Sequence, residues 1–401
     1  MVSAAMQQGI TFKDTGRPLA QDTDENWKSI AFDQEVPPMD TSMFIGLARE
    51  ALRRNNDLVR KGSISFDDQV YYPVVHDCRF PRYPLMTVDE SQDLNPLNHA
   101  MMRLAQPEQL AVFGDPKQAI YAFRGADSRS MDKILGLQGG EARWTQLPLA
   151  TTFRCPKSIV ARQQAHAPGF TAYHTNRDGQ VGAVGDAEDG WSWLQVMEVA
   201  NAVNSEMSRP GAPQLAVLCR NNAPLVSLAF KLIRSRVGVY MAGRELGKGL
   251  VTLSKKIAPE GSTPAPTIMA KLHEWQETQV SLARANRKED SIEGILDRAE
   301  CIRAVLEDSE CRDAEQLRAI LDRLFSGTTG LVTLSSIHRA KGLEWDTVIH
   351  LDPWRIPSRF ALQSASAGDP TQLEQEQNLL YVCETRTKHT LIPLSLEDFS
   401  R

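Results

Sequence analysis

Two adjacent carboxylates follow a short apolar run in the first quarter of the chain. Residues 85–88 (LMTV) lead directly into Asp89-Glu90-Ser91-Gln92-Asp93. A strand that ends in paired acids can hold a magnesium ion and orient a water molecule toward a terminal phosphate. Taken alone the pair is weak evidence, because adjacent acids at a strand end usually lie in a solvated turn or cap the next helix. The chemistry indicated is nucleotide hydrolysis, with Asp89 and Glu90 as the Mg²⁺ ligands.

The glycine-rich loop that usually accompanies such acids has no counterpart in the printed sequence. The pattern G-x-x-x-x-G-K-[ST], whose backbone amides and lysine cradle phosphates, finds no match. The nearest stretch, residues 243–249 (GRELGKG), lacks both the spacing and the hydroxyl. The sequence is therefore typical of part of an ATP-driven machine without its first phosphate-binding element.

Apolar strands that alternate with helices must position these acids. The predicted strands are residues 85–88, 109–113, 214–220, 330–334 and 347–351, with a further strand and turn at 144–152. The predicted helices are residues 43–60, 99–104 and 223–236, with another beginning near Pro156. This alternation predicts an α/β protein with parallel sheets flanked by helices.

In residues 255–324 the alternation of apolar strands and helices gives way to charged, helix-forming sequence. Pro264 and Pro266 predict a linker, and two charged helical stretches at 271–325 predict a small helical insertion that interrupts the second sheet.

Composition narrows the class of protein. The chain has 401 residues, of which 42% are hydrophobic and 24% charged, enough for two or three globular domains. No apolar stretch approaches the roughly 20 residues that span a bilayer, and no secretory signal begins the chain, so we expect a cytoplasmic protein without a membrane partner. The net charge of -5 gives no general attraction to nucleic acid. Any contacts with DNA must therefore be local.

Four further segments follow the acidic run in a fixed order. They are residues 114–126 (GDPKQAIYAFRGA), 152–156 (TFRCP), 336–346 (SIHRAKGLEWD) and 378–386 (NLLYVCETR). Together with residues 89–93 they resemble motifs II to VI of the UvrD/Rep-like superfamily 1 DNA helicases. The resemblance implies two RecA-like lobes with ATP between them, single-stranded DNA across their tops, and 3′-to-5′ translocation. It also implies an incomplete first lobe, because the family's Walker A region is not matched.

The resemblance assigns the acidic segment and the one after it to ATP hydrolysis. Asp89 would hold Mg²⁺, and Glu90 would polarise the attacking water. Gln118 would sense the terminal phosphate, since its amide can donate and accept without a change of charge. The competing interpretation makes Gln118 an ordinary turn residue.

Three residues of the later segments are assigned to ATP by the same resemblance. Arg154 and Arg386 would reach the γ-phosphate as arginine fingers. Glu344 would accept hydrogen bonds from the ribose hydroxyls. The alternatives are surface salt bridges for the two arginines and a solvated loop position for Glu344.

Aromatic and basic residues in the same segments are predicted to contact DNA. The predicted contacts are Tyr121, Phe123, Arg124, His338, Arg339 and Lys341. Tyr121 and Phe123 have the spacing that puts two rings on one face of an extended segment, where bases can stack. Core packing is the competing account of Phe123. His338, Arg339 and Lys341 lie at a strand-to-helix turn suited to phosphate oxygens.

These assignments give a domain map and two rival functions. We expect residues 1–70 to be the remnant of a helical subdomain, 71–145 a partial first lobe, 146–250 with 328–401 the second lobe, and 251–327 the helical insertion. The favoured function is the core of an ATP-dependent 3′-to-5′ DNA helicase, truncated or split at its N-terminus, that acts on single-stranded DNA or forks. The alternative is a catalytically silent accessory protein that binds single-stranded DNA, or a subunit completed by a separate polypeptide carrying the Walker A loop.

Overall fold

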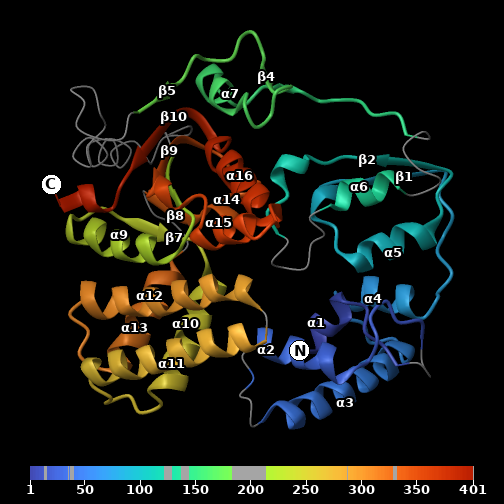
Figure 1. Ribbon diagram of the computed structural model, residues 1–401, viewed down its shortest axis with the longest axis horizontal. Coiled ribbons are helices and arrows are strands. Elements are labelled where there is room, and N and C mark those ends of the chain that lie inside the picture. Colours follow the sequence, from blue (N-terminus) through green and yellow to red (C-terminus); the bar gives the residue numbers. More distant parts are fainter. Residues whose placement is uncertain are drawn as a thin grey trace. The chain divides into compact units, whose positions relative to one another are not determined.

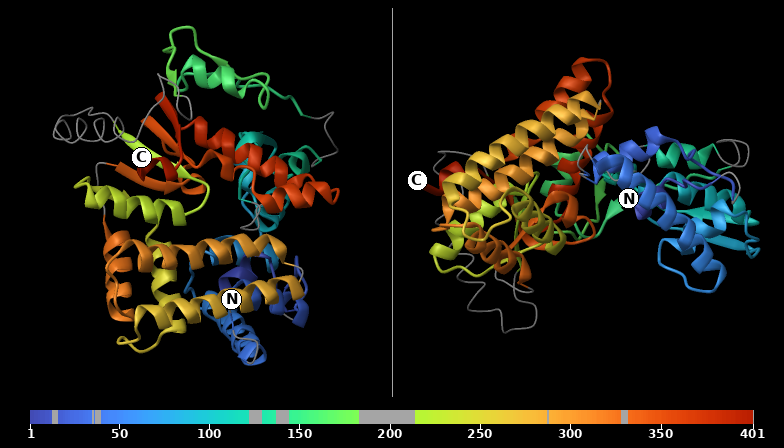
Figure 2. Two further views of the ribbon diagram at one scale, coloured as in Figure 1. Left: turned by 60° about the vertical axis from the view of Figure 1, so that its left-hand side comes forward. Right: turned by 90° about the horizontal axis from the view of Figure 1, so that it is seen from below.

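A computed structural model of the chain divides into two compact units, Met1–Leu147 and Pro148–Arg401. It describes residues 1–12, 16–34, 36, 40–121, 129–136, 144–182, 214–286, 288–327 and 332–400. Each unit has parallel strands with helices beside them (Figures 1 and 2). The predicted class, a mixed α/β protein with parallel sheets flanked by helices, is confirmed.

Helices form the beginning of the first unit. They are α1 (Val2–Gln7), α2 (Asp24–Asp33), α3 (Thr41–Arg60) and α4 (Asp68–Val75). The predicted amphipathic helix at 43–60 is confirmed as α3, whose buried residues Ile45, Ala48, Leu52 and Asn56 recur at helical spacing. One core joins α3 to its neighbours through Met6, Trp27, Ile30, Tyr71, Val75 and Leu97. Because Leu97 belongs to the later helix α5 (Pro96–Ala105), this core extends from the N-terminal helices to the helix that follows the acidic segment.

Two parallel strands carry the acidic segment and its neighbour. Strands β1 (Leu85–Val88) and β2 (Gln109–Val112) are joined by α5 (Pro96–Ala105), and both predicted strands are confirmed. Val88 pairs with Val112, so the two strands end side by side. The 3₁₀ turns η2 (Ser91–Asp93) and η3 (Pro116–Gln118) follow at this edge.

The last helix described in the first unit is α6 (Ser130–Leu135). Helix α4 runs across the boundary predicted at residue 70, and that boundary stays a prediction.

A six-stranded parallel sheet forms the centre of the second unit, in the order β5-β10-β9-β6-β8-β7. The strands are β5 (Gln180–Val181), β6 (Leu215–Cys219), β7 (Val239–Met241), β8 (Val332–Ser336), β9 (Trp345–Leu351) and β10 (Thr387–Leu394). All five residues of β6 are buried, as expected of a parallel strand covered on both faces. The strands predicted at 214–220 and 347–351 are confirmed. The strand predicted at 330–334 is β8, and its first two predicted residues lie outside the described part of the chain.

Helices and a small second sheet accompany this sheet. The helices are α7 (Lys157–Gln163), α9 (Ala223–Arg234), α14 (Ile337–Ala340), α15 (Arg359–Ser366) and α16 (Thr371–Glu384), with 3₁₀ turns η8 (Pro353–Arg355) and η9 (Glu397–Ser400). The second sheet pairs β3 (Thr151–Thr152) with β4 (Thr171–Ala172). Of the strand and turn predicted at 144–152, only the strand residues Thr151 and Thr152 are found, because residues 144–150 have no regular structure.

A helical bundle lies between β7 and β8 in the sequence. It contains α10 (Arg244–Ile257), α11 (Ala265–Ala285), η7 (Glu289–Ser291), α12 (Ile292–Asp308) and α13 (Ala314–Ser326). The prediction of two helical stretches is wrong, since α11, α12 and α13 all fall within or across the predicted range. The linker prediction is also wrong, because Pro264 is the N-cap of α11 and Pro266 lies in its first turn. Proline is favoured there, since the first N–H groups of a helix need no partner within the helix.

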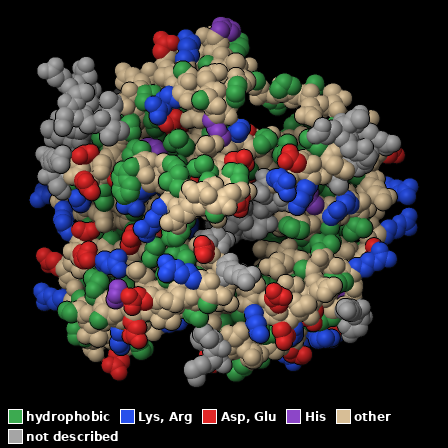
Figure 3. Space-filling model, viewed as in Figure 1, with side chains coloured by type: hydrophobic (Ala, Val, Ile, Leu, Met, Phe, Trp, Pro, Cys, Tyr) green, Lys and Arg blue, Asp and Glu red, His purple; other side chains and the backbone are tan. Residues whose placement is uncertain are grey.

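Two surface properties bear on the possible partners. No helix in the described ranges combines the length and apolar character needed to cross a membrane. On the face shown in Figure 3, Lys and Arg side chains are interspersed with Asp and Glu. This mixture agrees with the expectation that contacts with a nucleic acid are local.

Candidate functional site

The acidic turn of the first unit has a defined shape. Asp89 and Glu90 are exposed, and the Asp89 Oδ1 atom accepts the Glu90 backbone N–H at 2.8 Å. Glu90 has a φ of 50°, a left-handed conformation that few residues other than glycine adopt. Mg²⁺ prefers one or two carboxylates, with water and substrate phosphates completing its octahedral shell. The donor set of this turn fits a magnesium ion, with Asp89 and Glu90 as the residues that would hold it.

The buried Gln92 connects the acidic turn to the turn after β2. Its side chain is 2% exposed. Its Nε2 donates to Glu90 Oε2 at 2.5 Å, and its Oε1 accepts the backbone N–H of Asp115 at 3.1 Å. Asp115 Oδ2 in turn accepts from Gln118 Nε2 at 2.9 Å. The structure thus brings Glu90 and Gln118 into one hydrogen-bonded network, through a glutamine to which the sequence analysis gave no role.

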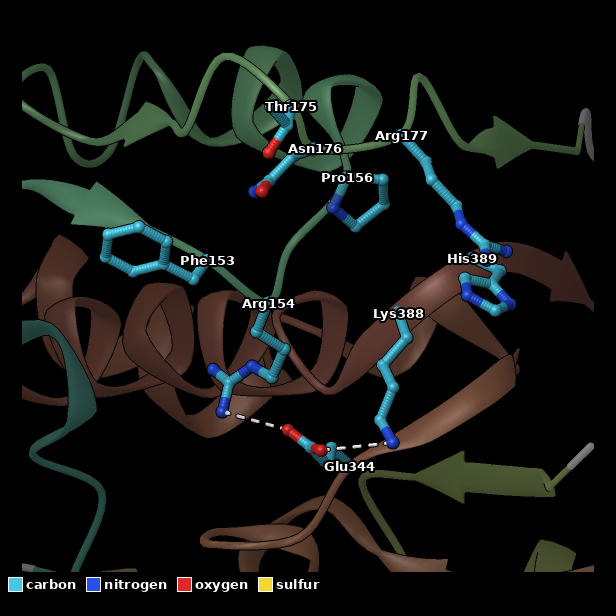
Figure 4. Close-up of a pocket in the computed structure, with 9 residues that line it drawn as sticks. All are labelled: Phe153, Arg154, Pro156, Thr175, Asn176, Arg177, Glu344, Lys388 and His389. Carbon is cyan, nitrogen blue, oxygen red and sulfur yellow. Dashed lines mark ion pairs between the residues drawn. The ribbon is translucent and has the colours of Figure 1, made fainter. Parts of the chain in front are cut away.

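A pocket of about 560 Å³ lies within the second unit. Its lining residues are Phe153, Arg154, Pro156, Thr175, Asn176, Arg177, Glu344, Lys388 and His389 (Figure 4). Glu344 lies between two cations: its Oε2 is 3.9 Å from Arg154 Nη1, and its Oε1 is 3.0 Å from Lys388 Nζ. The structure therefore brings Arg154 and Glu344 together in one cavity, and adds basic side chains that the sequence analysis did not select.

Hydrogen bonds fix the backbone that carries Arg154. Thr152 Oγ1 accepts the backbone N–H groups of Arg154 and Cys155, both at 3.2 Å. Asn176 Nδ2 donates to the carbonyl oxygens of Thr152 and Cys155 at 2.8 and 2.9 Å. The Nε atom of Arg154 is buried and has no hydrogen-bond partner among the described residues. An oxygen-rich ligand could supply that partner.

Arg386, just beyond the end of α16, is 2% exposed. Its guanidinium donates to the carbonyl oxygens of Val382 at 3.1 Å and Leu343 at 3.4 Å, and to Thr385 Oγ1 at 3.1 Å. Within the described ranges no carboxylate pairs with it. Burial, followed by the charge of Arg154, lowers the pKa of Arg386 to about 10. A buried cation without a counter-charge favours the binding of an anion.

An exposed aromatic ring borders the pocket that contains Arg154 and Glu344. Phe153 is 73% exposed, and its ring centroid lies 4.7 Å from that of Tyr173. Sequence reasoning did not select Phe153, although it directly precedes Arg154. An exposed ring beside a polar pocket can stack on a planar base.

The residues predicted to contact DNA are distributed over both units. His338 and Arg339 lie on α14, directly after β8, and Lys341 follows the helix; all three are half-buried. Tyr121 is half-buried in the first unit. Phe123 and Arg124 lie outside the described residues. The strand-to-helix turn expected around residue 338 is confirmed, whereas the contacts with DNA stay a prediction.

Two family models match the chain. The UvrD/REP helicase N-terminal domain matches residues 46–135, which include Glu90 and Gln118. The UvrD-like helicase C-terminal domain matches residues 266–397, which include Glu344 and Arg386. The chain belongs to the UvrD/Rep-like helicase family. The family identified from the motifs is thereby confirmed, and the parallel sheets flanked by helices agree with the RecA-like fold of UvrD/Rep-like helicases.

Several curated helicases resemble this UvrD/Rep-like chain. The ATP-dependent DNA helicase UvrD2 of Mycobacterium tuberculosis is 25% identical over 411 residues, which cover 90% of this chain and 55% of that protein. The F-box DNA helicase protein 1 of Schizosaccharomyces pombe is 23% identical over 331 residues, which cover 80% of this chain and 35% of that protein. The chain thus spans between a third and just over half of the length of these two relatives.

Proposed function

We propose that this chain acts in an ATP-dependent DNA helicase that moves 3′ to 5′ along single-stranded DNA. The observation that carries the proposal is that two guanidinium groups in the second unit have little or no carboxylate among the described residues to neutralise them. Arg386 has no carboxylate partner in the described part of the chain, and Arg154 has only Glu344, at 3.9 Å. A buried and a half-buried cation, both weakly compensated, are suited to bind the phosphates of a nucleotide.

The first unit would contribute the groups that act on the attacking water. Asp89 would hold Mg²⁺, which when bound neutralises charge on the phosphates. Glu90 would orient the water and accept its proton. The hydrogen bond from Gln92 fixes the Glu90 side chain, and the network reaches Gln118, which would contact the terminal phosphate. This network supports assigning Glu90 and Gln118 to one step.

The second unit would contribute the groups that stabilise charge on the phosphates. Arg154 and Arg386 would donate to the γ-phosphate as charge develops there, and the buried Nε of Arg154 would gain its missing acceptor. Glu344 would accept from the ribose hydroxyls. Phe153 would stack on the base, since its ring is exposed at the edge of the same pocket.

DNA would be held by local contacts. His338, Arg339 and Lys341 would bind phosphate oxygens, and Tyr121, Phe123 and Arg124 would contact bases and backbone. His338 lies in the segment between β8 and β9, and Glu344 lies in the same segment. A shift of this segment on nucleotide binding would therefore change the affinity for DNA.

Hydrolysis of ATP by the purified protein tests the proposal. Single-stranded DNA should stimulate the rate in wild type, and Glu90→Gln should lower kcat at least 100-fold because the general base is lost, within the range of such groups. Glu108→Gln changes an exposed acid of the same unit and should leave the rate unchanged. Equal rates in wild type and Glu90→Gln would exclude the assigned mechanism.

Direction of movement needs a second experiment. Duplexes with either a 3′ or a 5′ single-stranded tail would be offered with ATP. We expect displacement of the short strand only from the 3′-tailed substrate. Displacement from the 5′-tailed substrate alone would contradict the proposed polarity.

A further inference from the structure

A buried carboxylate lies two positions before Arg386 in the sequence and belongs to none of the roles above. Glu384, at the end of α16, is 2% exposed. It accepts from Arg162 Nε at 3.1 Å and Nη2 at 2.8 Å, and from Gln163 Nε2 at 2.6 Å. Both donors lie on α7, the helix that directly follows the segment of Arg154. Glu384 therefore joins the helix before Arg386 to the helix after Arg154.

Other contacts join the same two segments, but they are weaker. Cys155 Sγ donates to the Thr385 carbonyl oxygen at 3.5 Å. His166 Nε2 lies 3.0 Å from Asn378 Oδ1, and its ring packs near Tyr381. Among these contacts only Glu384 pairs opposite charges, and paired charges form the stronger hydrogen bonds. We therefore expect the Glu384 contact to dominate the docking of α7 on α16.

The need for such a contact follows from the charges on the two segments. Arg154 lowers the pKa of Arg386, so the two guanidinium groups repel each other before any anion binds. Repulsion would drive the segment of Arg154 away from α16. The Arg162–Glu384 ion pair opposes this separation from the other end of the same segment, and it raises the pKa of Arg162. The bond thus favours an arrangement with both arginines in place for a phosphate.

We propose that Glu384 is a positioning residue: its bond to Arg162 and Gln163 holds Arg154 beside Arg386, so that both meet the phosphates together. The inference rests on the proposed function, since it assumes that these arginines bind phosphate. Glu384 does not touch the ligand. Its influence should therefore pass through Arg154.

A double-mutant cycle on the full chain tests this route. Wild type, Glu384→Gln, Arg154→Lys and the double variant are compared by their affinity for tripolyphosphate and by kcat for ATP. Glu384→Gln should weaken tripolyphosphate binding and lower kcat at least fivefold in wild type, but less than twofold in Arg154→Lys. Arg162→Gln should reproduce the effect. Glu374→Gln, an exposed acid on the same helix, should change neither quantity.

The outcomes separate the inference from the proposed function. Equal effects of Glu384→Gln in both backgrounds, or no effect, would overturn the positioning role even if ATP is hydrolysed. Coupling seen in tripolyphosphate affinity without any hydrolysis by wild type would support the positioning role and contradict the helicase proposal. A wild type that binds no tripolyphosphate would overturn both. Melting temperatures of all variants identify any loss that comes from unfolding.

Discussion

Gln92 donates a 2.5 Å hydrogen bond to Glu90, while the other atom of its amide accepts the Asp115 backbone N–H. The two bonds use opposite ends of one amide, so the amide cannot rotate without breaking both. A phosphate that moves Gln118 would pull on Asp115, and through Gln92 on Glu90. This relationship gives Gln92 the role of coupling phosphate contact to the orientation of the general base.

Replacement of Gln92 tests this coupling. Gln92→Ala removes the donor to Glu90 and leaves the part-buried Asp115 N–H without its acceptor, which costs about 1 kcal/mol of interaction free energy. We expect kcat for ATP to fall ~10-fold or more, since about 1.4 kcal/mol of transition-state energy corresponds to a factor of ten. Gln109→Ala alters an exposed glutamine of β2 and serves as the control. Unchanged kcat in Gln92→Ala would show that Glu90 is oriented by other groups.

Gly114 should not tolerate a side chain. A Cβ at this position would lie 2.4 Å from Ser91 Oγ, 2.7 Å from Gln92 Oε1 and 2.9 Å from Met131 Sδ. Gly114→Ala must therefore displace side chains of the acidic turn, including Gln92, and overpacking of this kind costs about 1 to 3 kcal/mol. Gly46 on α3 has nothing within 4 Å of its Cβ position, so Gly46→Ala should stabilise the protein by ~0.5 to 1 kcal/mol. Urea unfolding of the two variants should shift in opposite directions, and a shift in the same direction would contradict the geometry at Gly114.

The sequence was sufficient to predict the elements whose pattern is local. The apolar run Leu215–Cys219 predicts a buried strand, and all five residues are buried in β6. The acids after β1 and the turn after β2 could be expected at one edge, because parallel strands place their carboxyl ends together. These features are set by residues that are close together in the sequence, so they can be predicted from one sequence.

Contacts between distant residues could not be predicted. Glu384 and Arg162 are 222 positions apart, and no periodicity relates them. Gln92 lies in the motif that drew attention, yet its partner Asp115 comes 23 positions later. The linker predicted at Pro264 was wrong for a different reason: proline fixes φ at a value that suits both a turn and the start of a helix, and only packing decides between them.

Glu344 offers a test of nucleotide specificity. If it accepts from the ribose hydroxyls, Glu344→Gln should raise KM for ATP ~10-fold, as expected for a hydrogen bond to a charged group. The same variant should change KM for 2′,3′-dideoxy-ATP less than twofold, because that nucleotide has no hydroxyl to donate. Exposed Glu397→Gln is the control. Equal changes for both nucleotides would mean that Glu344 acts through Arg154 and Lys388, the two cations that it contacts.

His350 on β9 should make the stability of the second unit depend on pH. It is 2% exposed, and burial lowers its pKa from 6.5 to about 4, with Glu384, Arg162 and Asp352 as the charged groups that also act on it. The unfolded chain therefore binds a proton near pH 6.5, whereas the folded chain binds it only near pH 4. The folded chain therefore has its full free energy of unfolding above pH 6.5, where His350 is neutral in both states, and loses part of it as the pH falls toward 4. Uptake of this one proton by the unfolded chain lowers the free energy of unfolding by ~2 kcal/mol between pH 6.5 and 5.

His350→Leu removes the titrating group and places an apolar side chain at this buried position of the strand. The free energy of unfolding in urea, measured at pH 7 and pH 5, should fall by ~2 kcal/mol less in this variant than in wild type. His273→Gln changes an exposed histidine on α11, which is paired with Glu277, and should follow wild type. If His350→Leu loses as much stability as wild type between the two pH values, His350 takes up its proton equally well in the folded and unfolded chains.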